Sequence, residues 1–114
     1  MDQLVENSRN PHNTCDVADL KAELQNSPPL VVDVRPPEVY AKQHVAGAVN
    51  IPLESLDNRR QDLPQDRAAP IVTVCSRGIM SISGMLYLQS LGYRNVRSLN
   101  GGTIAWTEQG LPTE

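Results

Sequence analysis

The sequence lacks the features that define several large classes of protein. It has only two cysteines, Cys15 and Cys75, which are too few for a disulfide framework. Its longest apolar run is about five residues, far short of the roughly 20 that a membrane-spanning helix needs. It also lacks an excess of basic residues, since the formal net charge is −3 and the isoelectric point about 5.3. A disulfide scaffold, a membrane protein and a nucleic-acid partner are therefore not expected.

The N-terminal segment also lacks a sorting signal. Residues 1–13 read MDQLVENSRNPHN and contain neither a charged n-region nor an apolar h-region. We interpret residues 1–13 as a flexible lead-in and residues 14–114 as one domain, because 114 residues is close to the commonest domain size. We expect the protein to be cytoplasmic, where both thiols stay reduced.

Helix-like and strand-like segments alternate along the chain. Short β-branched runs predict buried strands at residues 30–34, 71–74 and 95–99. A briefer strand is predicted at residues 48–50. Helices are predicted from a cap at Asp16, with Asp19 at the third helical position, and at residues 37–42, 53–60, 81–91 and 103–109. This alternation predicts an α/β domain with a small parallel sheet and helices on both faces.

Cys75 follows the predicted strand 71–74 and precedes a helix, where sites of open α/β sheets gather. Gly78 allows the following loop to curl, so that several N–H groups point inward beside a helix N-terminus. Such a cradle binds anions and lowers the pKa of a thiol, and Arg77 adds positive charge. The pattern favours a nucleophilic thiolate over the alternative, a buried and inert cysteine.

Four stretches of the chain, in order, resemble the rhodanese (sulfurtransferase) family. They are VVDVR at 31–35, HVAGAVNIP at 44–52, CSRGIMS at 75–81 and GGTIAW at 101–106. Four ordered motifs are specific where any single one would be weak. The likeness covers roughly residues 16–112, with Gln43 standing where the family usually has glycine.

The resemblance implies a three-layer rhodanese-like fold and transfer of sulfane sulfur. The Cys75 thiolate would take sulfur from an anionic donor such as thiosulfate, carry it as a persulfide and pass it to cyanide or a thiol. The loop would hold the donor and the leaving sulfite through Ser76, Arg77, Gly78, Ile79, Met80 and Ser81. No metal or organic cofactor is implied, and the physiological acceptor stays open between small thiols, thioredoxin and a sulfur-carrier protein.

Three other functions compete with sulfur transfer. Phosphatase and arsenate reductase loops need C-x5-R, but the sixth position after Cys75 is Ser81. A thioredoxin-like site needs C-x-x-C, and that position is Gly78. A rhodanese-like module that carries sulfur, senses redox state or binds partners without turnover stays open, although the intact Cys75 argues against it.

Outside the loop, we expect structural roles. Cys15 could be a resolving thiol or share a metal with His12, but two ligands do not make a site, so a structural or exposed thiol is expected. We expect His44 to hydrogen-bond a loop rather than to act as an acid or base. We expect Asp33 and Arg35 to pair and anchor loops, and Trp106 to lie in the core.

Overall fold

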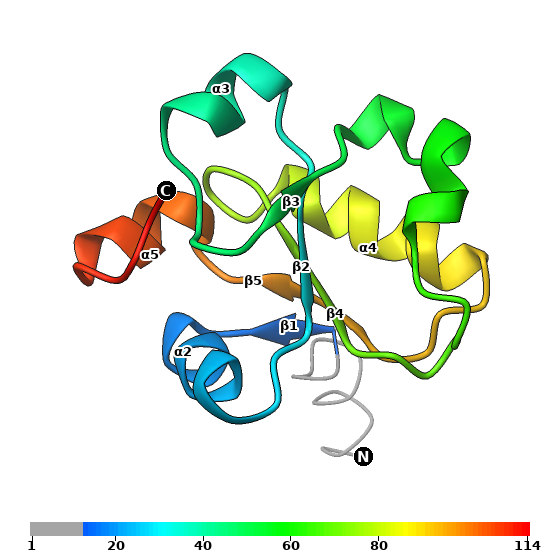
Figure 1. The fold of residues 1–114 in the computed structure, drawn as a ribbon, viewed down its shortest axis with the longest axis horizontal. Coiled ribbons are helices and arrows are strands. Elements are labelled where there is room, and N and C mark those ends of the chain that lie inside the picture. Colours follow the sequence, from blue (N-terminus) through cyan, green and yellow to red (C-terminus); the bar gives the residue numbers. More distant parts are fainter. Residues whose placement is uncertain (1–12) are drawn as a thin grey trace, which may run out of the picture.

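Five parallel strands form the centre of the molecule, as the computed structural model of residues 13–114 shows (Figure 1). Their order in the sheet is β1-β5-β4-β2-β3. The strands are β1 (Thr14–Cys15), β2 (Leu30–Asp33), β3 (Val49–Asn50), β4 (Ile71–Val74) and β5 (Val96–Leu99). The expected parallel sheet is therefore confirmed, and β4, which precedes Cys75, is its central strand.

Helices cover both faces of this sheet. The α-helices are α2 (Val17–Asn26), α3 (Pro37–Lys42), α4 (Met80–Ser90) and α5 (Gly102–Glu108), and two 3₁₀ helices, η1 (Leu53–Ser55) and η2 (Asp57–Asp62), lie between β3 and β4. Successive residues of a strand point to opposite faces. Val32 accordingly packs in the core with α4 and η1, whereas Val31 packs in the core with α2 and α5. The predicted three layers are thus confirmed.

Local sequence signals explain where α2 and α3 begin. The backbone N–H of Asp16 donates to the Asp19 carboxylate at 3.0 Å, which confirms the predicted cap of α2. Pro37 occupies the first position of α3, where its missing N–H costs nothing. Gln43, the departure from the family pattern, has an extended φ of −170°, so glycine is not required there.

Two sequence predictions need correction. The helix predicted at residues 53–60 is instead two short 3₁₀ helices, with a non-helical backbone at Arg59. Neither 3₁₀ helix contains a buried residue, and the buried Leu56 and Leu63 only flank η2, which is too sparse a pattern to support a continuous α-helix. Strand β1 was not predicted, because two residues carry no periodicity and its hydrogen bonds depend on β5.

Strand β1 places Cys15 in the core of the domain. This residue pairs with Leu99, lies at the carboxyl end of a strand and is only 4% exposed. Of the two roles expected for Cys15, it therefore has the structural one and is not an exposed thiol. Burial is the main cause that raises the pKa of Cys15 to about 11. Both cysteines are free, and β5 lies between their strands. His12 and the rest of the predicted lead-in up to residue 12 lie outside the described residues.

The sheet topology determines where a site can form. After β2 the chain continues to β3 on one side, whereas after β4 it continues to β5 on the other. The two connections therefore diverge at the carboxyl ends of β2 and β4. A crevice at such a divergence is the usual ligand site of open α/β sheets.

Candidate functional site

Cys75 lies at this divergence, at the start of the loop that joins β4 to α4. Gly78 has a φ of +91°, as the sequence predicted, and this turns the loop back around the sulfur. A Cβ at Gly78 would come within 2.9 Å of the Leu99 carbonyl oxygen, so glycine is also required by space. Only 3% of Cys75 is exposed. The loop therefore forms a tight bowl with the sulfur inside it.

Hydrogen-bond donors converge on the Cys75 sulfur. The backbone N–H groups of Gly78 and Ser81 lie 3.1 and 3.2 Å from Sγ, and the Ser81 hydroxyl oxygen lies 3.4 Å from it. Ser81 is in the first turn of α4, and no side chain caps the start of this helix. The Cys75 sulfur therefore accepts the hydrogen bond from the Ser81 backbone N–H that a capping side chain would otherwise accept. The dipole of α4 favours negative charge at the same place.

These contacts decide the ionisation of the thiol. Burial by itself would raise the pKa of Cys75. The hydrogen bonds from the Ser81 hydroxyl and from the backbone N–H groups of Ser81, Gly78 and Arg77 outweigh burial, and the pKa of Cys75 is lowered from its ordinary value. Each such bond to a charged group contributes about 1.5–3 kcal/mol. The loop therefore favours a thiolate, the reactive form of cysteine.

The start of α5 fixes the backbone of the loop. The N–H of Thr103 donates to the Cys75 carbonyl at 2.8 Å, and the N–H of Ile104 donates to the Ser76 carbonyl at 3.0 Å. Gly102 makes this approach possible, since a Cβ there would lie 2.2 Å from the Cys75 carbonyl oxygen. Gly102 is thus explained by contact with the Cys75 loop, whereas Gly101 has a φ of +76° and a Cβ there would lie 2.5 Å from the Ala105 Cβ.

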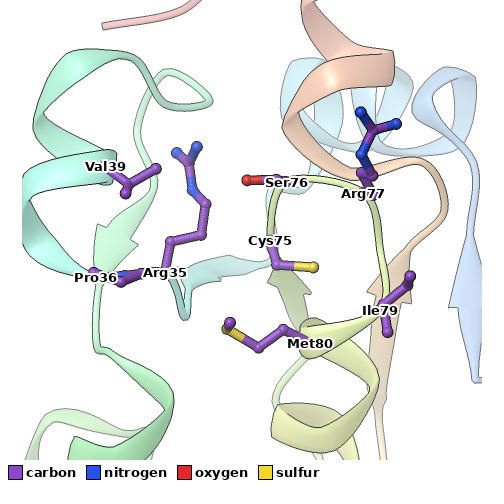
Figure 2. Close-up of a pocket in the computed structure, with 8 residues that line it drawn as sticks. All are labelled: Arg35, Pro36, Val39, Cys75, Ser76, Arg77, Ile79 and Met80. Carbon is purple, nitrogen blue, oxygen red and sulfur yellow. The ribbon is translucent and has the colours of Figure 1, made fainter.

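A pocket of about 250 Å³ opens beside Cys75 (Figure 2). The residues that line it come from the loop and from the segment after β2: Cys75, Ser76, Arg77, Ile79 and Met80, with Arg35, Pro36 and Val39. The volume lies below the roughly 300–1,000 Å³ typical of sites for drug-sized ligands. It suits a small ligand, and the apolar side chains around it weaken the competition from water.

Two arginines supply positive charge at the pocket. Arg35 is buried and forms a bidentate pair with Asp33, with Nη2 2.7 Å from the carboxylate, so most of its charge is balanced. Arg77 is exposed, and its side chain makes no ion pair or hydrogen bond with residues 13–114. Its guanidinium extends from the loop away from Sγ (Figure 2). Arg77 is therefore the unbalanced charge near the mouth.

The structural roles expected for the other candidates are confirmed. Asp33 anchors Arg35, and the Asn50 amide donates to the carbonyls of both, which holds the end of β2. The Nδ1 of His44 lies 2.8 Å from the Tyr40 carbonyl oxygen, and its ring stacks on Tyr40. Trp106 is 1% exposed and donates to the Pro112 carbonyl.

Sequence reasoning missed two polar residues of this site. Thr103 and Ser98 come from α5 and β5, and their roles depend on tertiary contacts with the loop. The sequence contained one signal for Ser98, a hydroxyl within the strand VRSL at 96–99. Arg35 was expected to anchor loops, and the structure also places it in the pocket wall.

Two further findings concern residues 13–114. No group of three or more histidine, cysteine or acidic side chains lies close enough in this range to hold a metal ion. No helix formed by these residues is long and apolar enough to cross a membrane.

Comparison with known proteins agrees with the four motifs. The rhodanese-like domain profile matches residues 16–109. A sulfurtransferase of Allochromatium vinosum is 36% identical, over 73% of this chain and 76% of its own. The thiosulfate sulfurtransferase GlpE of Pseudomonas fluorescens is 38% identical, over 73% of this chain and 81% of its own. The rhodanese-like domain of an Anabaena protein superposes with a TM-score of 0.80 at 29% identity, over 89% of this chain and 77% of its own.

Proposed function

The chain belongs to the rhodanese-like domain family, and from this premise we propose that it is a sulfurtransferase in which Cys75 carries the transferred sulfur. The donor in this proposal is a small sulfane-sulfur anion such as thiosulfate, and the acceptor is cyanide or a thiol. The observation that carries the proposal is the set of N–H and O–H donors around Cys75 Sγ. They favour a nucleophile that needs no separate general base.

In the first half-reaction, the Cys75 thiolate attacks the outer sulfur of thiosulfate. A new S–S bond forms, the bond from the outer sulfur to the sulfonate breaks, and sulfite leaves with the electron pair. Cys75 then carries a persulfide with one negative charge. The N–H groups of the bowl are oriented before the reaction and stabilise this charge without reorganisation.

In the second half-reaction, the acceptor attacks the outer sulfur of the persulfide. Cyanide leaves as thiocyanate, or a thiolate leaves as a new persulfide, and the Cys75 thiolate is regenerated. The two half-reactions share one nucleophile and one pocket, which predicts ping-pong kinetics.

The size and charge of the pocket support a small anionic donor. Its volume of about 250 Å³ accommodates thiosulfate, and Arg77 provides an unbalanced positive charge near the mouth. A protein with net charge −3 repels a dianion over most of its surface, so local positive potential assists capture.

Formation of thiocyanate from thiosulfate and cyanide tests the proposal. Wild-type protein should turn over, and Cys75→Ser should abolish the activity because a hydroxyl cannot hold a persulfide. Cys15→Ser is the matched control, because it makes the same change in a buried cysteine that does not line the pocket. Absence of turnover in folded wild-type protein would instead favour a module that carries sulfur, senses redox state or binds partners.

A further inference from the structure

A second buried hydroxyl lies behind the one that contacts the Cys75 sulfur. Ser98 comes from β5, and its Oγ lies 2.7 Å from Ser81 Oγ, which in turn lies 3.4 Å from Cys75 Sγ. We propose that Ser98 is a positioning residue for Cys75 and acts through the Ser81 hydroxyl. The three side chains form a chain of hydrogen bonds, here called the line, from β5 to the Cys75 sulfur.

The two serine hydroxyls are buried, which indicates that their hydrogen bond has a function. Ser81 is 0% exposed and Ser98 is 1% exposed, and the apolar Val96, which shares a face of β5 with Ser98, is also buried. A buried hydroxyl costs free energy unless it is hydrogen-bonded. Among residues 13–114, Ser81 is the only side chain that bonds to the Ser98 hydroxyl. The Ser98 hydroxyl therefore depends on Ser81, whereas Ser81 also contacts Cys75.

The donor roles along this line follow from counting protons, because each hydroxyl has one. When Cys75 is a thiol, its S–H donates to Ser81 Oγ, and Ser81 donates to Ser98. When the thiol proton leaves to solvent, the sulfur can only accept, so Ser81 must donate to it. The oxygen of Ser81 is then free to accept from Ser98, and the direction of both bonds reverses.

Ser98 thereby stabilises the thiolate over the thiol. A hydroxyl that accepts a hydrogen bond becomes a better donor, and bonds in such a chain strengthen one another by roughly 10–30%. Ser98 also holds the Ser81 side chain in the rotamer that points at Sγ. Because β5 is bonded to β4 through the pair Thr73 and Ser98, the geometry is built into the sheet itself.

The charged groups on the surrounding elements do not duplicate this effect. Helix α4 carries no charged residue, and α5 carries only Glu108 at its last position. Arg97 of β5 pairs with Glu23 of α2, on the other face of the sheet. The other elements carry the Asp33–Arg35 pair at the end of β2, the exposed Glu38 and Lys42 of α3, and Arg77 in the loop. Glu54 lies on η1, and Asp57 and Arg60 of η2 bond to Tyr87 of α4.

The pH dependence of alkylation of Cys75 by iodoacetamide tests the proposal. Ser98→Ala should raise the apparent pKa of Cys75 by about 0.5–1 unit, which slows alkylation about three- to tenfold at a pH below both values. Ser98→Thr keeps the hydroxyl and should give a pKa closer to wild type. If Ser98→Ala does not fold, Ser98→Val takes its place, because it has the shape of Ser98→Thr without the hydroxyl.

A double-mutant cycle separates this role from a structural one. In a Ser81→Ala background, Ser98→Ala should cause no further shift of the pKa, because the connecting hydroxyl is gone. Tyr93→Phe is the control: it removes the hydroxyl of a buried residue that donates to the Pro64 carbonyl and is not bonded to Cys75, Ser81 or Ser98, so it should lower the melting temperature without moving the pKa.

Three results would overturn the proposal. They are an unchanged pKa in folded Ser98→Ala, an equal shift in the presence and absence of the Ser81 hydroxyl, and an equal shift in Tyr93→Phe. Alkylation reports on the thiolate alone, so the test is valid even for a protein that transfers no sulfur. Failure of this inference is therefore distinguishable from failure of the proposed function.

Discussion

The backbone N–H of Thr103 donates a 2.8 Å hydrogen bond to the carbonyl of Cys75, which connects α5 to the residue proposed to carry the transferred sulfur. The side chain of Thr103 reaches the same carbonyl. Residues 28 positions apart in the chain are thus held in one rigid unit. The position of Cys75 depends on a helix that does not line the pocket.

Gly102 is the position where this contact is most sensitive to substitution. In Gly102→Ala the new Cβ would lie 2.2 Å from the Cys75 carbonyl oxygen, so the loop must move. We expect about 1 kcal/mol of destabilisation from the positive φ and about 1–3 kcal/mol more from the clash. Turnover should fall at least tenfold, because displacement of the loop misaligns the donors around Sγ.

Gly110→Ala is the matched control for this substitution. Gly110 also has a positive φ, +69°, but nothing lies within 4 Å of an added Cβ. Melting temperature and thiocyanate formation should be measured for both variants. Equal losses in the two would mean that backbone strain alone, and not contact with the loop, explains the effect.

Arg77 is predicted to assist the capture of an anionic donor. A hydrogen bond to a charged group contributes about 1.5–3 kcal/mol, and 1.4 kcal/mol corresponds to a factor of ten. Arg77→Ala should therefore lower kcat/KM for thiosulfate by roughly ten- to a hundredfold. Reaction of the preformed persulfide with a neutral thiol should change much less.

Arg94→Ala is the control for the loss of one positive charge away from the pocket. Arg94 is exposed like Arg77, and its side chain makes no hydrogen bond with residues 13–114 and does not line the pocket. This variant should keep wild-type kinetics. If Arg77→Ala also stays within a factor of two of wild type, the backbone N–H groups hold the donor alone and the role assigned to Arg77 is wrong.

The two cysteines are predicted to differ in their reactivity. The pKa of Cys75 lies below its ordinary value, so its alkylation rate should reach a plateau at lower pH than that of a small free thiol. Cys15 is buried with a pKa of about 11 and should stay unmodified at neutral pH while the protein is folded. Peptide mapping after brief treatment with iodoacetamide should find the label on Cys75 only. Comparable labelling of Cys15 would contradict this difference.

Much of this site could be predicted from the sequence because its signals are local. The β-branched run before Cys75 predicted β4, and Gly78 predicted the positive φ that closes the bowl. The remainder depends on contacts between distant segments. Strand β1 has two residues and exists only beside β5, so the strand-end position of Cys15 had no local signal. Ser98 and Thr103 likewise acquire their roles only when β5 and α5 pack against the loop.

The loop is also predicted to be inactive towards phosphate esters. Phosphoryl transfer needs a positive group that forks the transferring oxygens, and the position that would supply it is occupied by the buried Ser81. Wild-type protein should not measurably hydrolyse an aryl phosphate. Hydrolysis that disappears in Cys75→Ser would show that the loop supports a different chemistry from the one proposed.

Mass spectrometry of the intact protein after treatment with thiosulfate, in the absence of an acceptor, tests the central claim most directly. We expect wild-type protein to gain the mass of one sulfur atom. Fragmentation should place this sulfur on Cys75, and cyanide should remove it. Cys15→Ser should gain the same mass, and Cys75→Ser should gain none. A folded wild-type protein that takes up no sulfur, or that carries it on Cys15, would contradict the account.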